Sequence, residues 1–130
     1  MFAGCKGQIG LPLVRALCKE VGNDNVIATD VSEKKVDLPC RQEQLDVCDM
    51  DKYEKLVKEN KVDYIVHLAA ILSALGEKFP DRAATVNVDG AINALNLARD
   101  NNLQVFIPST IAVFGGDKFP KVKTPSDTIL

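Results

Sequence analysis

Apolar residues recur every three or four positions in three segments, which is the spacing that places one apolar stripe along a helix. In residues 7–21 the stripe consists of Ile9, Leu13, Ala16 and Leu17. In residues 51–59 it consists of Tyr53, Leu56 and Val57. In residues 81–101 it consists of Ala84, Val88, Ile92 and Leu95. We therefore expect three amphipathic helices that bury these residues, the second of them capped by Asp51.

Between the helical segments lie short runs that are apolar throughout. Residues 26–30, 63–68 and 105–107 predict buried strands, and residues 44–47 predict a weaker one. Buried strands that alternate with amphipathic helices are typical of a parallel sheet covered on both faces, so the fold class is α/β. Ligands of such sheets bind beyond the carboxyl ends of the strands. Here these ends fall just after Asp30, Asp46, Leu68 and Ser109.

Composition narrows the class of function. The chain has 130 residues, 46% of them apolar and 26% charged, as expected for a single globular domain. A formal charge of -2 provides no basic field for nucleic acid or anionic lipid, and no apolar run is long enough for a membrane span or a secretory signal. The cysteines lack metal-site spacing and His67 is the single histidine, so we expect no metal site. His67 is expected to bond the backbone through one ring nitrogen.

Three glycines open the first predicted helix, in the string Gly4-Cys5-Lys6-Gly7-Gln8-Ile9-Gly10. A glycine-rich turn that leads into a helix offers a diphosphate free backbone amides, the positive end of the helix dipole and no Cβ to hold it away. Glycines also suit tight turns and close helix packing. The string alone leaves both interpretations open.

Asp30 lies twenty residues beyond Gly10, at the end of the next predicted strand. A carboxylate in that place accepts hydrogen bonds from both hydroxyls of an adenosine ribose and repels a 2′-phosphate. A turn residue or a helix cap is the alternative role. Spacing and position together favour a dinucleotide site that takes NAD rather than NADP.

Further strings follow in a fixed order, namely residues 45–47 (Leu-Asp-Val), 67–70 (His-Leu-Ala-Ala) and 108–115 (Pro-Ser-Thr-Ile-Ala-Val-Phe-Gly). Together with the glycines and Asp30, they make nearly the whole chain resemble the extended short-chain dehydrogenase/reductases. Within that superfamily, residues 72–77 and 124–130 are similar to those of the NAD-dependent L-threonine 3-dehydrogenases. The resemblance implies a Rossmann-type doubly wound parallel sheet.

The resemblance also implies roles for particular residues. The cofactor-binding positions are Gly4, Gly7, Gln8, Ile9 and Gly10 at the diphosphate, Asp30 at the ribose, Asp46 and Val47 at the adenine, and Leu68, Ala69, Ala70 and Asn87 along the nicotinamide side. Ser73 is implied near the substrate, and Thr110 has the position of the catalytic serine or threonine whose hydroxyl bonds the reacting oxygen. In the family, a tyrosine followed four positions later by a lysine removes the substrate's hydroxyl proton.

Two parts of this pattern are missing from the sequence. Tyr53 and Tyr64 are followed four residues later by Val57 and Leu68, so no Tyr-x-x-x-Lys motif is present. Only three residues precede Gly4, where a whole central strand is expected. We therefore expect an incomplete NAD-binding domain that lacks most of its first strand, everything after the fifth, the catalytic Tyr-Lys segment and the substrate domain. Partial disorder or aggregation is the expected consequence.

The resemblance implies that the parent protein uses NAD to oxidise the 3-hydroxyl of L-threonine to 2-amino-3-ketobutyrate, in threonine catabolism. It further implies a homodimer that pairs through the long helix, in the cytoplasm or the mitochondrial matrix. A nucleotide-sugar epimerase or dehydratase of the same superfamily and a non-catalytic nucleotide-binding remnant stay open as alternatives. Because the Tyr-x-x-x-Lys motif is absent, we expect no turnover by this chain alone.

Overall fold

The computed structural model describes residues 1–110, which contain a five-stranded sheet in the order β3-β2-β1-β4-β5. The strands are β1 (Phe2–Ala3), β2 (Ile27–Asp30), β3 (Arg41–Gln44), β4 (Tyr64–His67) and β5 (Gln104–Phe106). All neighbouring strands are parallel. The predicted α/β fold of the Rossmann type is therefore confirmed.

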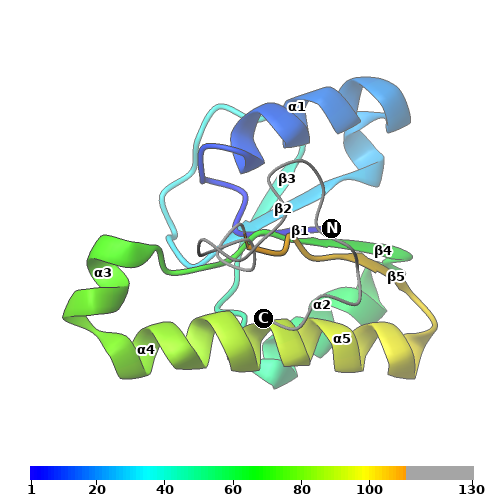
Figure 1. Cartoon of the computed structure of the whole chain (residues 1–130). Coiled ribbons are helices and arrows are strands. Elements are labelled where there is room, and N and C mark those ends of the chain that lie inside the picture. The colour runs from blue at the N-terminus through cyan, green and yellow to red at the C-terminus, as the bar shows by residue number, and fades with distance from the viewer. Residues whose placement is uncertain (111–130) are drawn as a thin grey trace, which may run out of the picture.

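Helices cover both faces of this sheet (Figure 1). They are α1 (Gly10–Val21), α2 (Met50–Glu59), α3 (Ser73–Lys78), α4 (Pro80–Ala84) and α5 (Gly90–Asn101), with a 3₁₀ turn η1 (Asn23–Asn25) and a π-helical turn η2 (Thr85–Asp89). Figure 1 shows α1 on one face and α2, α4 and α5 on the other. Within residues 1–110, none of the helices has the length and apolar character needed to cross a membrane.

The central strand β1 has two residues, yet it joins the two halves of the sheet. Phe2 pairs with Ala28 on β2 and with Val66 on β4. Successive side chains of a strand point to opposite faces. Phe2 accordingly packs in the core beneath α1, and Ala3 packs in the core beneath α2 and α5. Met1 continues this pairing before β1: its oxygen accepts from the Val66 amide at 2.9 Å.

The buried face of α1 differs from the prediction. Gly10, Val14 and Cys18 are its buried residues, whereas the predicted Ile9 is 63% exposed and Ala16 is also exposed. The other two predicted residues, Leu13 and Leu17, border the core. The reason is the close packing of Gly10 on the preceding loop, which turns the helix so that the predicted stripe lies at the edge of the contact.

The inner face predicted for residues 81–101 is wrong. Val88, Ile92 and Leu95 are 55%, 47% and 50% exposed, and Ala84 is exposed as well. The residues that face the sheet are Gly90, Ala94, Leu97 and Ala98. A Cβ on Gly90 would lie 2.6 Å from Cγ2 of Val47, so the small residues allow the helix to approach the core closely.

Three boundaries also differ. β3 occupies residues 41–44 instead of 44–47, because this edge strand is polar and the apolar Leu45 and Val47 are buried just beyond it. Asp49 rather than Asp51 caps α2, and its Oδ1 accepts a hydrogen bond from the Lys52 amide at 3.1 Å. The helix α3 was not predicted, and all its residues except Gly76 are exposed.

Candidate functional site

The loop between β1 and α1 is anchored at the carboxyl edge of the sheet. The amides of Gly4 and Cys5 donate to the carbonyl oxygen of Thr29 at 2.9 and 3.0 Å. Gly4 has φ +81°, and a Cβ there would lie 2.6 Å from the backbone nitrogen of Ala69. Only glycine fits this position without strain. The loop is thereby fixed between the ends of β2 and β4.

The two other glycines of the loop have different surroundings. A Cβ on Gly10 would lie 2.4 Å from the carbonyl oxygen of Cys5, so Gly10 is needed for packing. A Cβ on Gly7 would meet no described atom closer than the Gly4 oxygen at 3.8 Å, and Gly7 is exposed. The fold therefore explains Gly4 and Gly10, whereas the open space at Gly7 suits the close approach of a ligand.

The first turn of α1 is suited to an anion. Within the described part of the chain, no side chain caps this helix at Ile9, and its first turn carries no acidic residue. The first amides of a helix have no intrahelical acceptor and lie at the positive end of the helix dipole. Gln8 and Ile9 are exposed next to these amides. This geometry is that of a phosphate-binding helix terminus.

Asp30 lies at the end of β2, next to the glycine loop. Its Oδ2 accepts a hydrogen bond from the Lys6 amide at 3.0 Å, and its Oδ1 accepts one from the Ser32 amide at 3.1 Å. The Lys6 ammonium donates to the carbonyl oxygen of Ser32. The half-buried carboxylate is thus held in one orientation, and it has further lone pairs with which to accept ribose hydroxyls.

Cys5 is a packing residue of this loop. Its side chain is 1% exposed, and burial, followed by the nearby charge of Asp30, raises the pKa of its thiol to about 11. A thiol in that state stays protonated at neutral pH and is a poor nucleophile. A packing role therefore fits Cys5 better than a redox role.

The segment after β3 presents one side chain to solvent and buries the next. Asp46 is exposed, and its Oδ1 accepts a hydrogen bond from the Cys48 amide at 3.0 Å. Val47 is 4% exposed, and its carbonyl oxygen accepts from Nδ2 of Asn93 at 3.0 Å. Of this predicted pair, Asp46 is therefore the residue whose side chain is open to a ligand.

The segment after β4 is held by a side chain that belongs to η2. The Leu68 amide donates to the Ala3 oxygen at 2.7 Å, which continues the ladder. Asn87 accepts a hydrogen bond from the Ile71 amide at 2.7 Å and donates one to the Ile71 oxygen at 3.0 Å. Ala69 is half-buried and Ala70 is exposed. The resemblance implied that Asn87 supports this segment; the structure shows that its partner is Ile71, which the sequence analysis did not single out.

His67 lies buried at the end of β4. In the described residues, neither of its ring nitrogens has a hydrogen-bond partner of regular geometry, although the backbone of Ala69 lies close enough to act on the ring, as the backbone bond expected from the sequence would. Burial lowers the pKa of His67, and the neighbouring backbone of Ala69 opposes this shift only in part. The imidazole is therefore neutral at pH 7 and serves as a core residue.

The residues implied for the substrate side follow β4 and β5 along the chain. Ser73 is the first residue of α3, and Thr110 follows β5; both are exposed. Tyr53 is fully buried, and burial raises the pKa of its hydroxyl. Tyr64 begins β4 and so lies at the opposite edge of the sheet. Residues 111–115 and 124–130, which contributed to the resemblance, lie outside the described residues.

The whole arrangement matches a known family. The model of the NAD dependent epimerase/dehydratase family covers residues 1–128. The chain belongs to this family. Because the family is NAD dependent, NAD is the cofactor, as the sequence predicted. Among curated members of the epimerase/dehydratase family, an uncharacterized epimerase/dehydratase of Staphylococcus aureus (strain USA300) is 47% identical over 99% of the chain. The chain spans 41% of that protein's length.

Solved structures of the epimerase/dehydratase family show the same fold. An L-threonine 3-dehydrogenase from Trypanosoma brucei is 45% identical with a TM-score of 0.88, and a monomeric one from a metagenome is 45% identical with a TM-score of 0.89. Each comparison covers 99% of this chain and 41% of the other. A UDP-glucose-4-epimerase from Stenotrophomonas maltophila, solved with bound NAD, is 22% identical over 93% of this chain and 39% of its own, with a TM-score of 0.76. At that identity the likeness concerns the fold alone.

Proposed function

We propose that the chain forms the cofactor-binding part of an NAD-dependent L-threonine 3-dehydrogenase, which oxidises the 3-hydroxyl of L-threonine to 2-amino-3-ketobutyrate. The observation that carries the cofactor half of the proposal is the open space at Gly7 beside the uncapped start of α1, with Asp30 at the end of the next strand. Identities of 45% to two L-threonine 3-dehydrogenases support the substrate half.

The described residues fit a dinucleotide in three places. The diphosphate is held by the amides of residues 7–9, where no Cβ of Gly7 intervenes. Asp30 accepts the hydroxyls of the adenosine ribose, while Lys6 and Ser32 keep its carboxylate in place. Asp46 lies exposed on the adenine side. When bound, NAD supplies the hydride acceptor.

On the substrate side, Thr110 hydrogen-bonds the oxygen that reacts, and Ser73 lies near the amino-acid end of threonine. Thr110 follows a strand at the carboxyl edge, where ligands of such sheets bind. Proton removal needs a base with a suitable pKa, and buried Tyr53 and remote Tyr64 do not qualify. We therefore infer that the 130-residue chain binds NAD without turning over threonine.

Calorimetric titration of the chain with NAD and with NADP tests the cofactor site. We expect measurable binding of NAD and weaker binding of NADP, because the Asp30 carboxylate repels a 2′-phosphate. Glu20→Gln, at an exposed position in the last turn of α1, serves as the control and should leave NAD affinity unchanged. Equal affinity for both cofactors would refute the assignment of Asp30 to the ribose.

A second candidate is a nucleotide-sugar epimerase or dehydratase, which is favoured by the family name and by the description of the Staphylococcus aureus relative. The complete protein, with the further segments that its relatives possess, distinguishes the two. We expect NADH to form with L-threonine and not with UDP-galactose. The reverse result would establish the second candidate, and NAD binding without either activity would leave a nucleotide-binding remnant.

We further propose that the complete protein pairs through α5. Val88, Ile92 and Leu95 form an exposed apolar stripe on η2 and α5, and a stripe of this kind suits contact with a second copy. One similar dehydrogenase is described as monomeric, so pairing needs its own test. Sedimentation should show a dimer that Ile92→Glu dissociates, whereas Val31→Glu, at a residue with 55% exposure outside the stripe, should leave it intact.

A further inference from the structure

Asn93 connects the helix α5 to the segment that follows β3. Its Nδ2 donates to the carbonyl oxygen of Val47 at 3.0 Å, and the two residues lie 46 positions apart in the chain. Asn93 is half-buried, so this bond is partly shielded from water. A side-chain bond over so long a span of sequence joins two elements and adds nothing to the helix itself.

The packing of α5 brings it to the same segment one turn earlier. Gly90 lies three residues before Asn93, so both are on one face of the helix. A Cβ on Gly90 would lie 2.6 Å from Cγ2 of Val47, and the Val47 side chain is 4% exposed. Helix α5 therefore holds Val47 at two points, its side chain through Gly90 and its carbonyl oxygen through Asn93.

The peptide group between Val47 and Cys48 connects this hold to Asp46. Its carbonyl oxygen accepts from Asn93. Its amide, which belongs to Cys48, donates to Oδ1 of Asp46 at 3.0 Å. Because a peptide group is planar, a bond that fixes the carbonyl oxygen also fixes the direction of the amide. A hydrogen bond at one end further polarises the group and strengthens the bond at the other end.

The carboxylate of Asp46 is exposed and has capacity left for a ligand. The Cys48 amide occupies one position on Oδ1, whereas a carboxylate has about four lone-pair sites. An ionised carboxylate only accepts hydrogen bonds, so its ligand has to supply the donor. In adenine the donor is the exocyclic 6-amino group. A carboxylate held in one direction can therefore distinguish an amino group from an oxygen at that position of the base.

We propose that Asn93 is a positioning residue that selects the base of the cofactor. Through the peptide group after Val47, it directs the Asp46 carboxylate toward the 6-amino group of adenine. The proposal rests on the proposed function, since it takes NAD as the ligand and places its adenine beside Asp46. Asp46 contacts the base, and Asn93 acts through it.

The test compares NAD with nicotinamide hypoxanthine dinucleotide, which has an oxygen in place of the 6-amino group. Each is titrated into the whole chain by calorimetry. We expect a preference for NAD of about tenfold, because the oxygen offers the carboxylate no donor. Asn93→Ala should reduce the preference to about threefold or less, mainly through weaker binding of NAD. A merely structural loss would weaken both dinucleotides by the same factor and leave the preference intact.

A double-substitution cycle tests whether Asn93 acts through Asp46. Asp46→Ala removes the carboxylate and should abolish the preference. Asn93→Ala, added to that variant, should not change the ratio of the two affinities any further, because the group that Asn93 orients is gone. If Asn93→Ala instead lowers the ratio by the same factor with and without the carboxylate, the proposal is overturned.

Hydrogen exchange tests the same connection without a ligand. Asn93→Ala should speed exchange at the Cys48 amide, which loses the orientation that keeps it bonded to Asp46. Unchanged exchange at this amide would overturn the proposal, because Asn93 would then have no hold on the peptide group.

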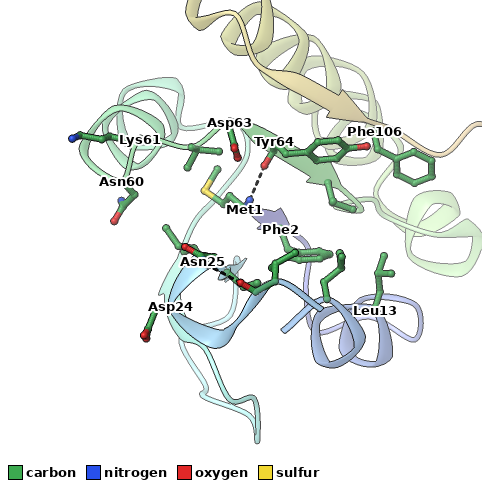
Figure 2. A pocket seen from close by; sticks show the side chains of 16 residues that line it. Met1, Phe2, Leu13, Asp24, Asn25, Asn60, Lys61, Asp63, Tyr64 and Phe106 are labelled. Atoms are coloured by element: carbon green, nitrogen blue, oxygen red, sulfur yellow. Dashed lines mark hydrogen bonds between the residues drawn. The ribbon is translucent and has the colours of Figure 1, made fainter. Parts of the chain in front are cut away.

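Two other half-buried asparagines serve as matched controls. Asn101, on the same helix, donates from its Nδ2 to the Leu97 oxygen at 3.0 Å. Asn60 donates in the same way to the Leu56 oxygen at 2.8 Å, and it lines a cavity of about 760 Å³ at the amino edge of the sheet (Figure 2). Asn101→Ala and Asn60→Ala each lose a bond of the same kind and should keep the full preference for NAD.

The outcomes separate the role of Asn93 from the function on which it rests. A chain that binds neither dinucleotide refutes the proposed function and this role together. A chain that binds both equally keeps its cofactor site, but the selection of the base by Asp46 is refuted, and the proposal with it. A chain that prefers NAD, and whose Asn93→Ala variant keeps the full preference, refutes the role of Asn93 alone.

Discussion

Alanine substitutions at Gly7 and Gly10 should separate cofactor binding from stability. The two glycines belong to the same short loop and have the same side chain, so a difference between the variants reports their surroundings. A Cβ added at Gly10 would lie 2.4 Å from the Cys5 carbonyl oxygen, whereas the described atom nearest to a Cβ at Gly7 is 3.8 Å away.

The expected magnitudes follow from these distances. At Gly10 the obstacle is backbone, which cannot rotate away, so Gly10→Ala should lower the free energy of unfolding by about 1–3 kcal/mol. Gly7 does not have a left-handed φ, so Gly7→Ala should leave stability unchanged or raise it by about 0.4–1 kcal/mol. A methyl group there holds a phosphate away from the amides of the helix terminus. Losing one charge-assisted hydrogen bond of about 1.5–3 kcal/mol weakens the binding of NAD about ten- to a hundredfold.

Urea unfolding of both variants measures stability, and calorimetric titration with NAD measures binding. We expect Gly7→Ala to keep the unfolding midpoint and lose affinity, and Gly10→Ala to lower the midpoint. The reasoning fails if Gly7→Ala binds NAD as tightly as the parent chain, because the diphosphate then does not lie against this loop. It also fails if Gly10→Ala unfolds at the parent midpoint, because the close contact with Cys5 would then be relieved at no cost.

Three further predictions concern the carboxyl edge. Asp30→Asn should weaken the binding of NAD about tenfold in calorimetry. It should also reduce the preference for NAD over NADP, because the charge that repels a 2′-phosphate is gone. Asn87→Ala should speed hydrogen exchange at the Ile71 amide and cost about 1–2 kcal/mol of stability, whereas Asn87→Asp, which can still accept from that amide, should slow the exchange again in part. Burial lowers the pKa of His67 in the folded chain below the ordinary value of 6.5. As the pH falls, the unfolded chain therefore takes up a proton on this ring before the folded chain does. The free energy of unfolding should therefore fall as the pH drops below about 6.5, and His67→Gln should remove that part of the slope in urea titrations at several pH values.

The parallel α/β sheet was predictable from the sequence because it depends on local patterns and on general rules of connection. Short apolar runs separated by amphipathic helices leave little choice but a parallel sheet with right-handed crossovers. The position of Asp30 at the end of its strand followed from the same pattern, and the structure places it beside the glycine loop, with Lys6 bonded to its carboxylate.

The faces of the helices were not predictable in the same way. Residues 81–101 carry two stripes. The predicted one consists mostly of large apolar residues, and the other, the small stripe, consists of small residues apart from Leu97, so periodicity favours the first. The structure buries the small stripe because Gly90 meets Val47 from a distant segment, and no local pattern records that contact. The same holds for Asn87, whose partner Ile71 lies sixteen residues away, in a segment that the sequence left without an element.

The last residues of the central strand β1 fix the position of the glycine loop. Ladder bonds are complete where β1 leaves the sheet, since the Gly4 amide reaches Thr29 and the Ala3 oxygen reaches the Leu68 amide. These bonds fix where the glycine loop begins, and with it the place of the proposed dinucleotide site beside Asp30.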